Sequence, residues 1–331
     1  MIKYVEKMAL QKVIFAYCDQ IMMSTMHDTL NFDVEAVAST YDTLGESPVW
    51  SDQDGRLYWI DVRRGRLQAF AARTRELNAW DFDGLLGGIA LRADGSFIVT
   101  RRASVDGFVP FEPNGLEGGV LAEDRLATLA CLPDKGTDHR TNEVKCDRLG
   151  NLWCGTMRDF GKDSTGALYR IDAARQPLEV QAGVTIPNAL DFSPDGKWVY
   201  FSDTVTGRID RAPFDSDVGV VGEWLTLIDA GAAPGKPDGL AIDQDGCLWN
   251  ARFGGSCIAR FDPYGRLMGT LALPVSQPTS CAFGGERLNT LFITSARQWL
   301  SDAALAQEPS AGALLACETE FTGLAPARYR G

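Results

Sequence analysis

The sequence predicts an all-β fold, a six-bladed β-propeller of four-stranded antiparallel blades around a central channel. Three observations predict it. Short strand-like runs separated by turn glycines recur six times, they recur at the spacing of propeller repeats, and helical periodicity is almost absent after residue 30. A period of roughly 40 to 50 residues is typical of propellers and solenoids. Closing such repeats into a ring hides the sheet edges that separate sheets would expose.

Each repeat reads as strand, glycine turn, strand, turn, strand. The paired first and second strands fall in residues 47–61, 89–100, 141–155, 186–204, 236–250 and 279–294. The third strands fall in residues 65–70, 107–111, 166–171, 207–211, 257–261 and 312–317. Outer fourth strands are expected around residues 80, 129, 179–180, 224–228 and 271–273. Residues 32–37 have no partner in their own repeat, so we expect them to complete the last blade and lock the ring.

The domain organisation follows from this pattern. Residues 31–331 form a single propeller domain, because no linker composition interrupts the repeats. Residues 1–30 form an N-terminal extension that is either helical or disordered. No stretch is long enough to span a bilayer.

Composition limits the partners. The chain has 331 residues and a formal net charge of -12, with a pI of about 4.7 and no cluster of lysine or arginine. These properties argue against nucleic acid and anionic membranes and favour a small polar or cationic ligand. The eight cysteines form no CxxC pair, which indicates reduced thiols in a cytoplasmic protein. Two histidines are too few for a zinc site built from histidine and cysteine.

One polar position recurs at the same phase of three repeats. Asn142, Asn188 and Asp238 each lie eight residues before a turn glycine, at the entrance of a predicted innermost strand. Glu46 lies nine residues before its glycine, one step out of phase, but its side chain is long enough to reach inward. In the second repeat the equivalent residue is Gly87, which we expect to leave open space.

These residues offer carboxylate and amide oxygens, which suit Ca²⁺, Mg²⁺ or Mn²⁺ and are acceptable to Zn²⁺. Taken singly, Asp238 reads as part of a turn, Asn188 as a loop cap and Glu46 as a solvated carboxylate. Their coincidence at one phase of the repeat favours a shared site in the channel.

Six motifs resemble one known family. They are LGESPVW at 44–50, RTNE at 140–143, WCGTM at 153–157, IPNALD at 186–191, KPDGL at 236–240 and CAFGG at 281–285. In this order they resemble the senescence marker protein (regucalcin), gluconolactonase and sugar-lactone lactonase family over residues 44–313.

The resemblance implies roles for individual residues. A six-bladed propeller would hold one divalent cation through Glu46, Asn188 and Asp238, and Asp238 would also act as general base. The substrate contacts implied are Arg140, Asn142, Glu143 and Asp159.

Two residues depart from the family pattern. Glu143 stands where aspartate is common, and Ala189 where glycine is usual. The alanine is expected to be tolerated if its backbone φ is negative.

The implied activity is metal-dependent hydrolysis of an aldono-1,4- or 1,5-lactone, such as gluconolactone, xylonolactone or arabinonolactone, to the aldonic acid. Two alternatives remain: a related propeller esterase or organophosphate hydrolase with a more apolar pocket, and a non-catalytic calcium-binding propeller. A serine hydrolase is disfavoured because G-x-S-x-G is absent. The sequence leaves open the sugar, the cation (Ca²⁺, Zn²⁺, Mn²⁺ or Mg²⁺) and the oligomeric state.

Overall fold

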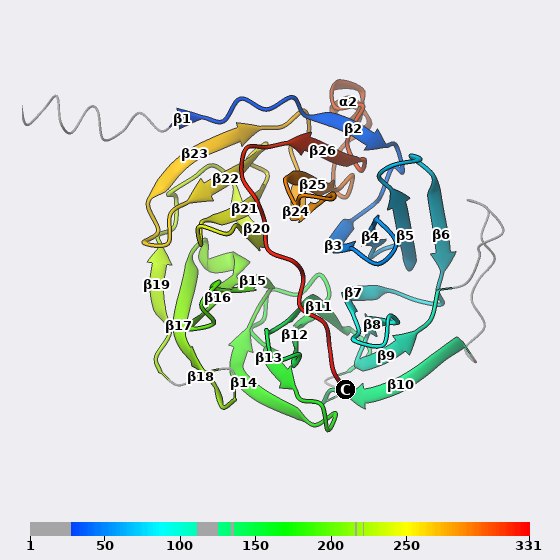
Figure 1. Cartoon of the computed structure of the whole chain (residues 1–331), viewed down its shortest axis with the longest axis vertical. Helices are drawn as coiled ribbons and strands as arrows, with labels where there is room; N and C mark the ends of the chain where they lie inside the picture. The colour runs from blue at the N-terminus through cyan, green and yellow to red at the C-terminus, as the bar shows by residue number, and fades with distance from the viewer. Residues whose placement is uncertain (1–27, 111–124, 134–135, 216, 221) are drawn as a thin grey trace, which may run out of the picture.

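Six small antiparallel sheets stand in a ring around a central channel (Figure 1). This computed structural model describes residues 28–331, except 111–124, 134–135, 216 and 221. The predicted six-bladed β-propeller is therefore confirmed. The blades are numbered 1 to 6 in the order in which their inner strands follow along the chain.

The first three blades each contain four consecutive strands, running from the channel outward. Blade 1 consists of β3 (Gly45–Ser51), β4 (Arg56–Asp61), β5 (Arg66–Ala71) and β6 (Leu77–Asp81). Blade 2 consists of β7 (Leu86–Leu91), β8 (Phe97–Arg101), β9 (Ser104–Phe108) and β10 (Leu126–Cys131). Blade 3 consists of β11 (His139–Cys146), β12 (Leu152–Arg158), β13 (Gly166–Ile171) and β14 (Pro177–Val184).

The other three blades add short extra elements to the same plan. Blade 4 consists of β15 (Pro187–Phe192), β16 (Trp198–Asp203), β17 (Ile209–Asp215), β18 (Gly219–Val220) and β19 (Leu225–Ile228), the last two both pairing with β17. Blade 5 consists of β20 (Lys236–Ile242), β21 (Leu248–Phe253), β22 (Cys257–Phe261), β23 (Leu267–Ala272) and β1 (Asp28–Thr29), which is parallel to β23. Blade 6 consists of β24 (Pro278–Gly284), β25 (Thr290–Ser295), β26 (Leu314–Glu318) and β2 (Glu35–Ala38), with the short helix α2 (Asp302–Gln307) in the β25–β26 connection.

The ring closes through an N-terminal strand, as predicted. β2 pairs antiparallel with β26, with Glu35 opposite Ala316, so the start and the end of the domain share blade 6. Residues 1–27, which make up most of the predicted N-terminal extension, lie outside the described residues.

The predicted position of the third strand of blade 2, residues 107–111, is wrong. The strand begins at Ser104, whereas Gly107 was expected to mark the turn before it. Gly107 instead lies within the ladder, paired with Ala127. A glycine inside a strand is indistinguishable from a turn glycine when only its spacing is considered.

Large aromatic side chains fill the space between the sheets. Trp153 and Trp249, on the second strands of blades 3 and 5, are fully buried. Their indole N–H groups donate to Asp147 at 3.0 Å and to Asp243 at 2.9 Å. The rings thus bury their apolar surface while their polar atoms keep hydrogen bonds, which fixes the inner hairpins that carry the site.

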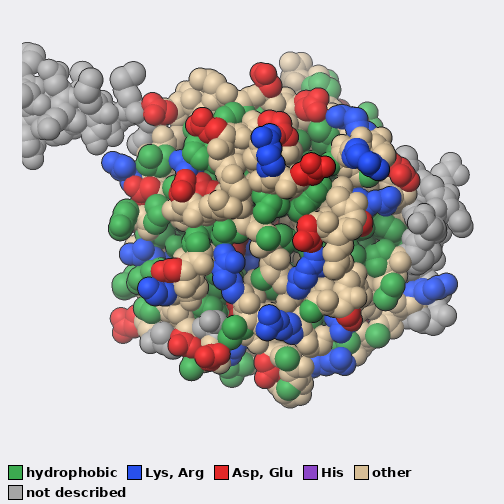
Figure 2. Space-filling view, viewed as in Figure 1, with side chains coloured by type: hydrophobic (Ala, Val, Ile, Leu, Met, Phe, Trp, Pro, Cys, Tyr) green, Lys and Arg blue, Asp and Glu red, His purple; other side chains and the backbone are tan. Residues whose placement is uncertain are grey.

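One end of the channel is crossed by residues 319–331, which we call the C-terminal strap (red in Figure 1). The Gln244 N–H donates to Thr322 O at 2.8 Å, and the Tyr329 N–H donates to Leu91 O at 2.8 Å. Leu91 ends the inner strand of blade 2, and Gln244 follows the inner strand of blade 5. The predicted site residues lie near the starts of inner strands, so the strap covers the opposite end of the channel. On this face, acidic and basic side chains are interspersed (Figure 2).

Candidate active site

Four polar side chains enter the channel from four inner strands. The repeat phase predicted three of them, and Glu46 joins them from one step out of phase. Glu46 lies on β3, Asn142 on β11, Asn188 on β15 and Asp238 on β20, and all four are buried. The register of the ladder shifts at or directly after each of them. Such a β-bulge changes the direction of a side chain, and bulges are common next to active sites. Because the bulge recurs in each of these blades, their polar residues converge on the channel.

The bulges require unusual backbone conformations. Ser47, Glu143 and Ala189, each directly after a site residue, have φ values of 51°, 54° and 49°. The condition under which Ala189 was expected to be tolerated, a negative φ, is therefore not met. A left-handed conformation costs an alanine roughly 1–2 kcal/mol, which glycine avoids. This cost accompanies the bulge that turns Asn188 into the channel.

The expectation for Gly87 was also wrong. A Cβ atom at this position would lie 1.8 Å from Thr141 Oγ1 and 2.5 Å from Thr141 O. Glycine here permits close packing of β7 against β11 and leaves no open space.

A chain of hydrogen bonds orients the amide of Asn188. Its Nδ2 donates to Thr204 Oγ1 at 2.8 Å, and Thr204 Oγ1 donates to Pro237 O at 2.9 Å. Its Oδ1 accepts a hydrogen bond from Asn142 Nδ2 at 3.1 Å. An amide oxygen has two lone pairs, so Asn188 Oδ1 keeps acceptor capacity for a ligand in the channel.

Both carboxylates of the site are removed from solvent, although Glu46 Oε2 accepts a hydrogen bond from the Ser47 N–H at 3.2 Å. Asp238 Oδ1 is buried and has no hydrogen-bond partner among the described residues. Burial raises the pKa of Glu46 to about 7. Burial, reinforced by the negative charges of Glu46 and Glu143, raises the pKa of Asp238 well above its ordinary value. Two desolvated carboxylates in one channel are costly to ionise without a cation.

The donor set fits a divalent cation that prefers oxygen ligands. Glu46 and Asp238 supply negative charge, and Asn188 supplies a neutral oxygen. Within the described part of the chain, no cluster of three or more His, Cys, Asp or Glu side chains is arranged to hold a metal ion. A cation here would therefore depend on the Asn188 amide as well as on the two acids.

A second charged group lies beside this set. Arg140 Nη1 donates to Asn142 Oδ1 at 2.7 Å, and Arg140 Nε donates to Asp159 Oδ1 at 2.9 Å. Arg63, from the β4–β5 turn, donates to Asp159 Oδ2 at 2.7 Å. Burial opposes ionisation of Asp159, but the Arg63 hydrogen bond and the Arg140 charge hold the pKa of this carboxyl below its ordinary value. Asp159 is thus an ionised bridge between two guanidinium groups.

Arg140 and Asp159 also line a cavity of about 510 Å³, which we call the outer pocket. Its lining comprises residues 83–85, 101–102, 104, 137–140 and 159–160. The outer pocket and the channel site therefore share the side chain of Arg140.

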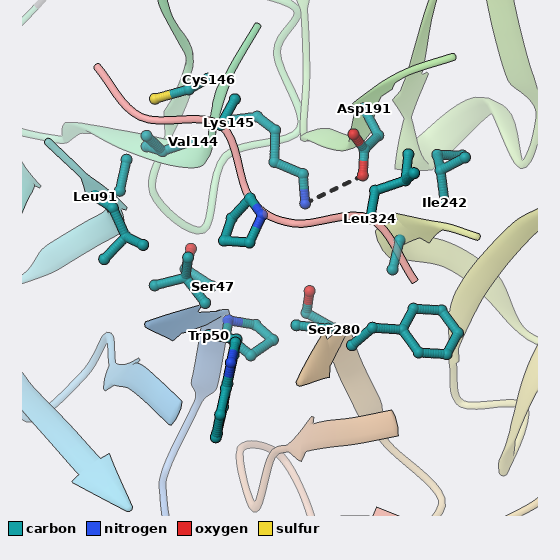
Figure 3. Close-up of a pocket in the computed structure, with 18 of the residues that line it drawn as sticks. Ser47, Trp50, Leu91, Val144, Lys145, Cys146, Asp191, Ile242, Ser280 and Leu324 are labelled. Atoms are coloured by element: carbon teal, nitrogen blue, oxygen red, sulfur yellow. Dashed lines mark ion pairs between the residues drawn. The ribbon is translucent and has the colours of Figure 1, made fainter. Parts of the chain in front are cut away.

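Glu143 faces a different space from Arg140. It lines a cavity of about 100 Å³ inside the channel, between the site and the C-terminal strap. In this cavity Lys145 Nζ lies 3.3 Å from Asp191 Oδ2 (Figure 3). Burial raises the pKa of Glu143 to about 8, against the attraction of Lys145. Glu143 therefore lies on the side of the site that faces the C-terminal strap, and it does not line the outer pocket.

Residues 44–297 match the family described as the SMP-30/Gluconolactonase/LRE-like region. This match spans more than half of the chain. The chain belongs to this family.

Members of the SMP-30/gluconolactonase family with named activities align along nearly the whole chain. The 6-deoxy-6-sulfogluconolactonase of Pseudomonas putida is 34% identical, covering 91% of this chain and 100% of that protein. The L-arabinolactonase of Azospirillum brasilense is 33% identical, covering 89% and 95%. The solved structure of a calcium-binding protein, regucalcin, from Agrobacterium tumefaciens superposes with a TM-score of 0.83 at 26% identity, covering 91% and 98%. The expected enzyme class, a lactone-hydrolysing hydrolase, is the class of the first two relatives.

Two further expectations concern the whole chain. The described cysteines are all free thiols, as expected. No helix among the described residues is long and apolar enough to cross a bilayer.

Two residues of the site were missed by sequence reasoning. Thr204 and Arg63 reach the site from connections between the second and third strands of blades 4 and 1, outside the inner-strand position that recurs along the chain. The repeat phase that identified Asn188 therefore gave no signal for them. The proximity of Thr204 to Asn188 arises because β15 and β16 form one hairpin.

Proposed function

We propose that this protein hydrolyses a sugar lactone to the aldonic acid with the help of one divalent cation. Glu46, Asn188 and Asp238 would hold the cation. Arg140 and Asn142 would hold the lactone. One observation carries the proposal. The buried Asp238 carboxylate lies near a second buried acid, Glu46, and its Oδ1 has no hydrogen-bond partner among the described residues.

The residues of the chain have distinct tasks in this reaction. Arg140 donates hydrogen bonds to sugar hydroxyls and is itself held by Asp159, so its guanidinium is positioned before the substrate arrives. Asn142 is fixed between Arg140 and Asn188, which places its amide at the boundary between substrate and cation.

Asp238 would act as the general base. The Asp238 carboxylate accepts a proton from the attacking water as the oxygen of that water bonds to the lactone carbonyl carbon. The same proton then returns to the ring oxygen as the ring C–O bond breaks.

A bound divalent cation would polarise the lactone carbonyl and stabilise negative charge that develops on its oxygen. Relatives with named activities support a lactone substrate, since they include a sulfogluconolactonase and an arabinolactonase. The description of the Agrobacterium tumefaciens regucalcin as a calcium-binding protein supports the involvement of a divalent cation.

The test is a panel of aldono-1,4- and 1,5-lactones assayed after chelation and after return of Ca²⁺, Mg²⁺, Mn²⁺ or Zn²⁺. We expect turnover to vanish with chelator and to return with at least one cation. Faster hydrolysis of phenyl acetate or a phosphotriester than of every sugar lactone would instead indicate an esterase or organophosphate hydrolase. Cation binding without turnover of any of these compounds would indicate a non-catalytic calcium-binding propeller.

A further inference from the structure

The outer pocket adjoins the proposed lactone site but is separate from it. Arg140 forms the wall between the two, because its Nη1 contacts Asn142 and its Nε contacts Asp159. A volume of about 510 Å³ lies in the range of small-molecule sites, roughly 300 to 1,000 Å³. A ligand that fills both spaces would need to be larger than one sugar ring.

The lining of the outer pocket offers donors and acceptors in balance. It contains three arginines, Arg101, Arg102 and Arg140, and three aspartates, Asp83, Asp138 and Asp159. A phosphate or sulfonate group would meet as many carboxylates as guanidinium groups and would gain little. A neutral polyol suits such a lining better, since each hydroxyl both donates and accepts a hydrogen bond.

One aromatic ring completes the pocket. Phe160 lines it, is 66% exposed and adopts a φ of 55°. Arg63 lies over this ring at 4.1 Å from its centroid, and the same Arg63 donates to Gln298 Oε1 at 2.6 Å. A left-handed backbone is strained for a phenylalanine, and residues strained in this way cluster at active sites and ligand-binding sites.

A second exposed aromatic side chain lies near Phe160. Trp299, on the β25–β26 connection of blade 6, is 71% exposed with a φ of 68°. Its ring centroid lies 6.5 Å from that of Phe160, on the β12–β13 connection of blade 3. Trp299 also packs on Phe253 of blade 5 at 6.2 Å. Three blades thus contribute to one aromatic rim at the open end of the channel.

We propose that the outer pocket is a second sugar subsite and that the preferred substrate is a glycosyl aldonolactone, a lactone that carries a second sugar ring. The lactone ring occupies the channel site at Arg140 and Asn142, and the second ring lies in the outer pocket against Phe160. The C–H bonds on one face of a pyranose carry partial positive charge, which the negative face of an aromatic ring attracts. This inference rests on the proposed lactonase function.

The experiment compares kcat/KM for glucono-1,5-lactone with that for the lactones of maltobionic and cellobionic acid. We expect the protein to favour at least one disaccharide lactone by roughly tenfold, the scale of one stacking contact. Phe160→Leu, which removes the flat ring but keeps an apolar side chain, should lower the disaccharide-to-monosaccharide ratio by a similar factor. Phe160→Tyr should preserve this ratio.

Tyr264→Leu provides the matched control. Tyr264 is 84% exposed and lies on the β22–β23 turn, so its replacement should leave the ratio unchanged. Equal kcat/KM for mono- and disaccharide lactones would overturn the proposal, as would a ratio insensitive to Phe160→Leu. A preference for 6-phosphogluconolactone over all neutral lactones would overturn the assignment of a neutral sugar.

Failure of the lactonase function would be recognised separately, because no lactone would then be hydrolysed. In that case calorimetric binding of maltobionate and cellobionate to the original protein and to Phe160→Leu tests the subsite alone. Binding that is weakened by Phe160→Leu supports the subsite. Absence of binding to either disaccharide acid rejects it.

Discussion

The hydroxyl of Thr204 links the side chain of Asn188 to the backbone beside Asp238. Thr204 Oγ1 accepts a hydrogen bond from Asn188 Nδ2 at 2.8 Å and donates one to the carbonyl of Pro237 at 2.9 Å. Thr204 opens the short 3-10 helix η2 (Thr204–Thr206) between β16 and β17. Thr204 is not itself a proposed cation ligand. It orients the ligand Asn188 and is hydrogen-bonded to the residue before the ligand Asp238.

Thr204→Val is expected to weaken cation binding. Valine has nearly the shape of threonine but cannot accept a hydrogen bond from Asn188 Nδ2. The amide then keeps only its contact with Asn142, and its oxygen is oriented less firmly. Loss of such an outer-shell contact typically reduces metal affinity by about 10- to 100-fold. Isothermal titration of the chelated protein with Ca²⁺ and Mn²⁺ measures the change.

Thr204→Ser is the control for this measurement, because it retains the hydroxyl. We expect its cation affinity to stay close to that of the original protein. Equal affinities for Thr204→Val and Thr204→Ser would show that the hydroxyl does not position the ligand.

Asp238→Asn is expected to stabilise the cation-free protein while abolishing its response to cations. The carboxylate is buried with an unpartnered oxygen, and removing its charge removes the desolvation cost. In chelator Tm should rise by ~1–2 °C for each kcal/mol gained, given the size of the domain. Addition of Ca²⁺, Mg²⁺, Mn²⁺ or Zn²⁺ should no longer raise Tm, and lactone turnover should be lost.

The same substitution at Asp245, on an exposed turn, is the control for Asp238→Asn. Asp245→Asn should keep both the cation-induced rise in Tm and the activity. If Asp238→Asn retains full lactone hydrolysis with cation bound, Asp238 is not the general base.

The repeat made much of the site predictable from sequence. Asn142, Asn188 and Asp238 share one phase because each occupies the same bulge of an inner strand, and the turn glycine that follows is equally regular. The ring closure by residues near 35 was predictable for a related reason, since a strand without a local partner must pair elsewhere.

Features that occur once could not be predicted in this way. The contact of Arg63 with Asp159 joins residues 96 positions apart, through two connections whose lengths differ from blade to blade. The positive φ of Ala189 is set by the bulge, and alanine itself carries no preference for that conformation. The C-terminal strap is not part of any repeat, so the periodicity of the sequence does not predict which end of the channel it covers.

The pH dependence of stability should contain a contribution from Glu143. Its pKa is raised to about 8 by burial, from an ordinary value of 4.5. Between these values the unfolded chain loses a proton that the folded protein keeps, so the stabilising contribution is complete below pH 4.5 and disappears as pH rises through about 8. The slope is at most about 1.4 kcal/mol per pH unit.

Glu143→Gln should flatten this slope in the cation-free protein. Urea unfolding at pH 6, 7 and 8 in the presence of chelator gives the free energies needed. Glu286→Gln, on an exposed turn, controls for the loss of one negative charge. The same slope in Glu143→Gln and in the original protein would contradict the assignment.

Ala189→Gly tests the strain at the bulge beside Asn188. Ala189 is fully buried at a φ of 49°, where an L-residue pays roughly 1–2 kcal/mol. Glycine removes that cost but loses one buried methyl, worth about 0.8 kcal/mol, and gains about 0.4–1 kcal/mol of unfolded-state entropy. These terms nearly cancel, so we expect the free energy of unfolding to change by less than about 1 kcal/mol.

Ala241→Gly supplies the matched comparison, because Ala241 is a buried alanine of β20 without a positive φ. At Ala241 a glycine loses the buried methyl and increases the entropy of the unfolded chain, and no backbone strain is relieved. A destabilisation of roughly 1–2 kcal/mol is expected. Urea unfolding of the two variants under identical conditions measures the difference. Ala189→Gly must be the milder substitution if the bulge stores strain, and an equal loss in both variants would mean that the left-handed alanine costs nothing.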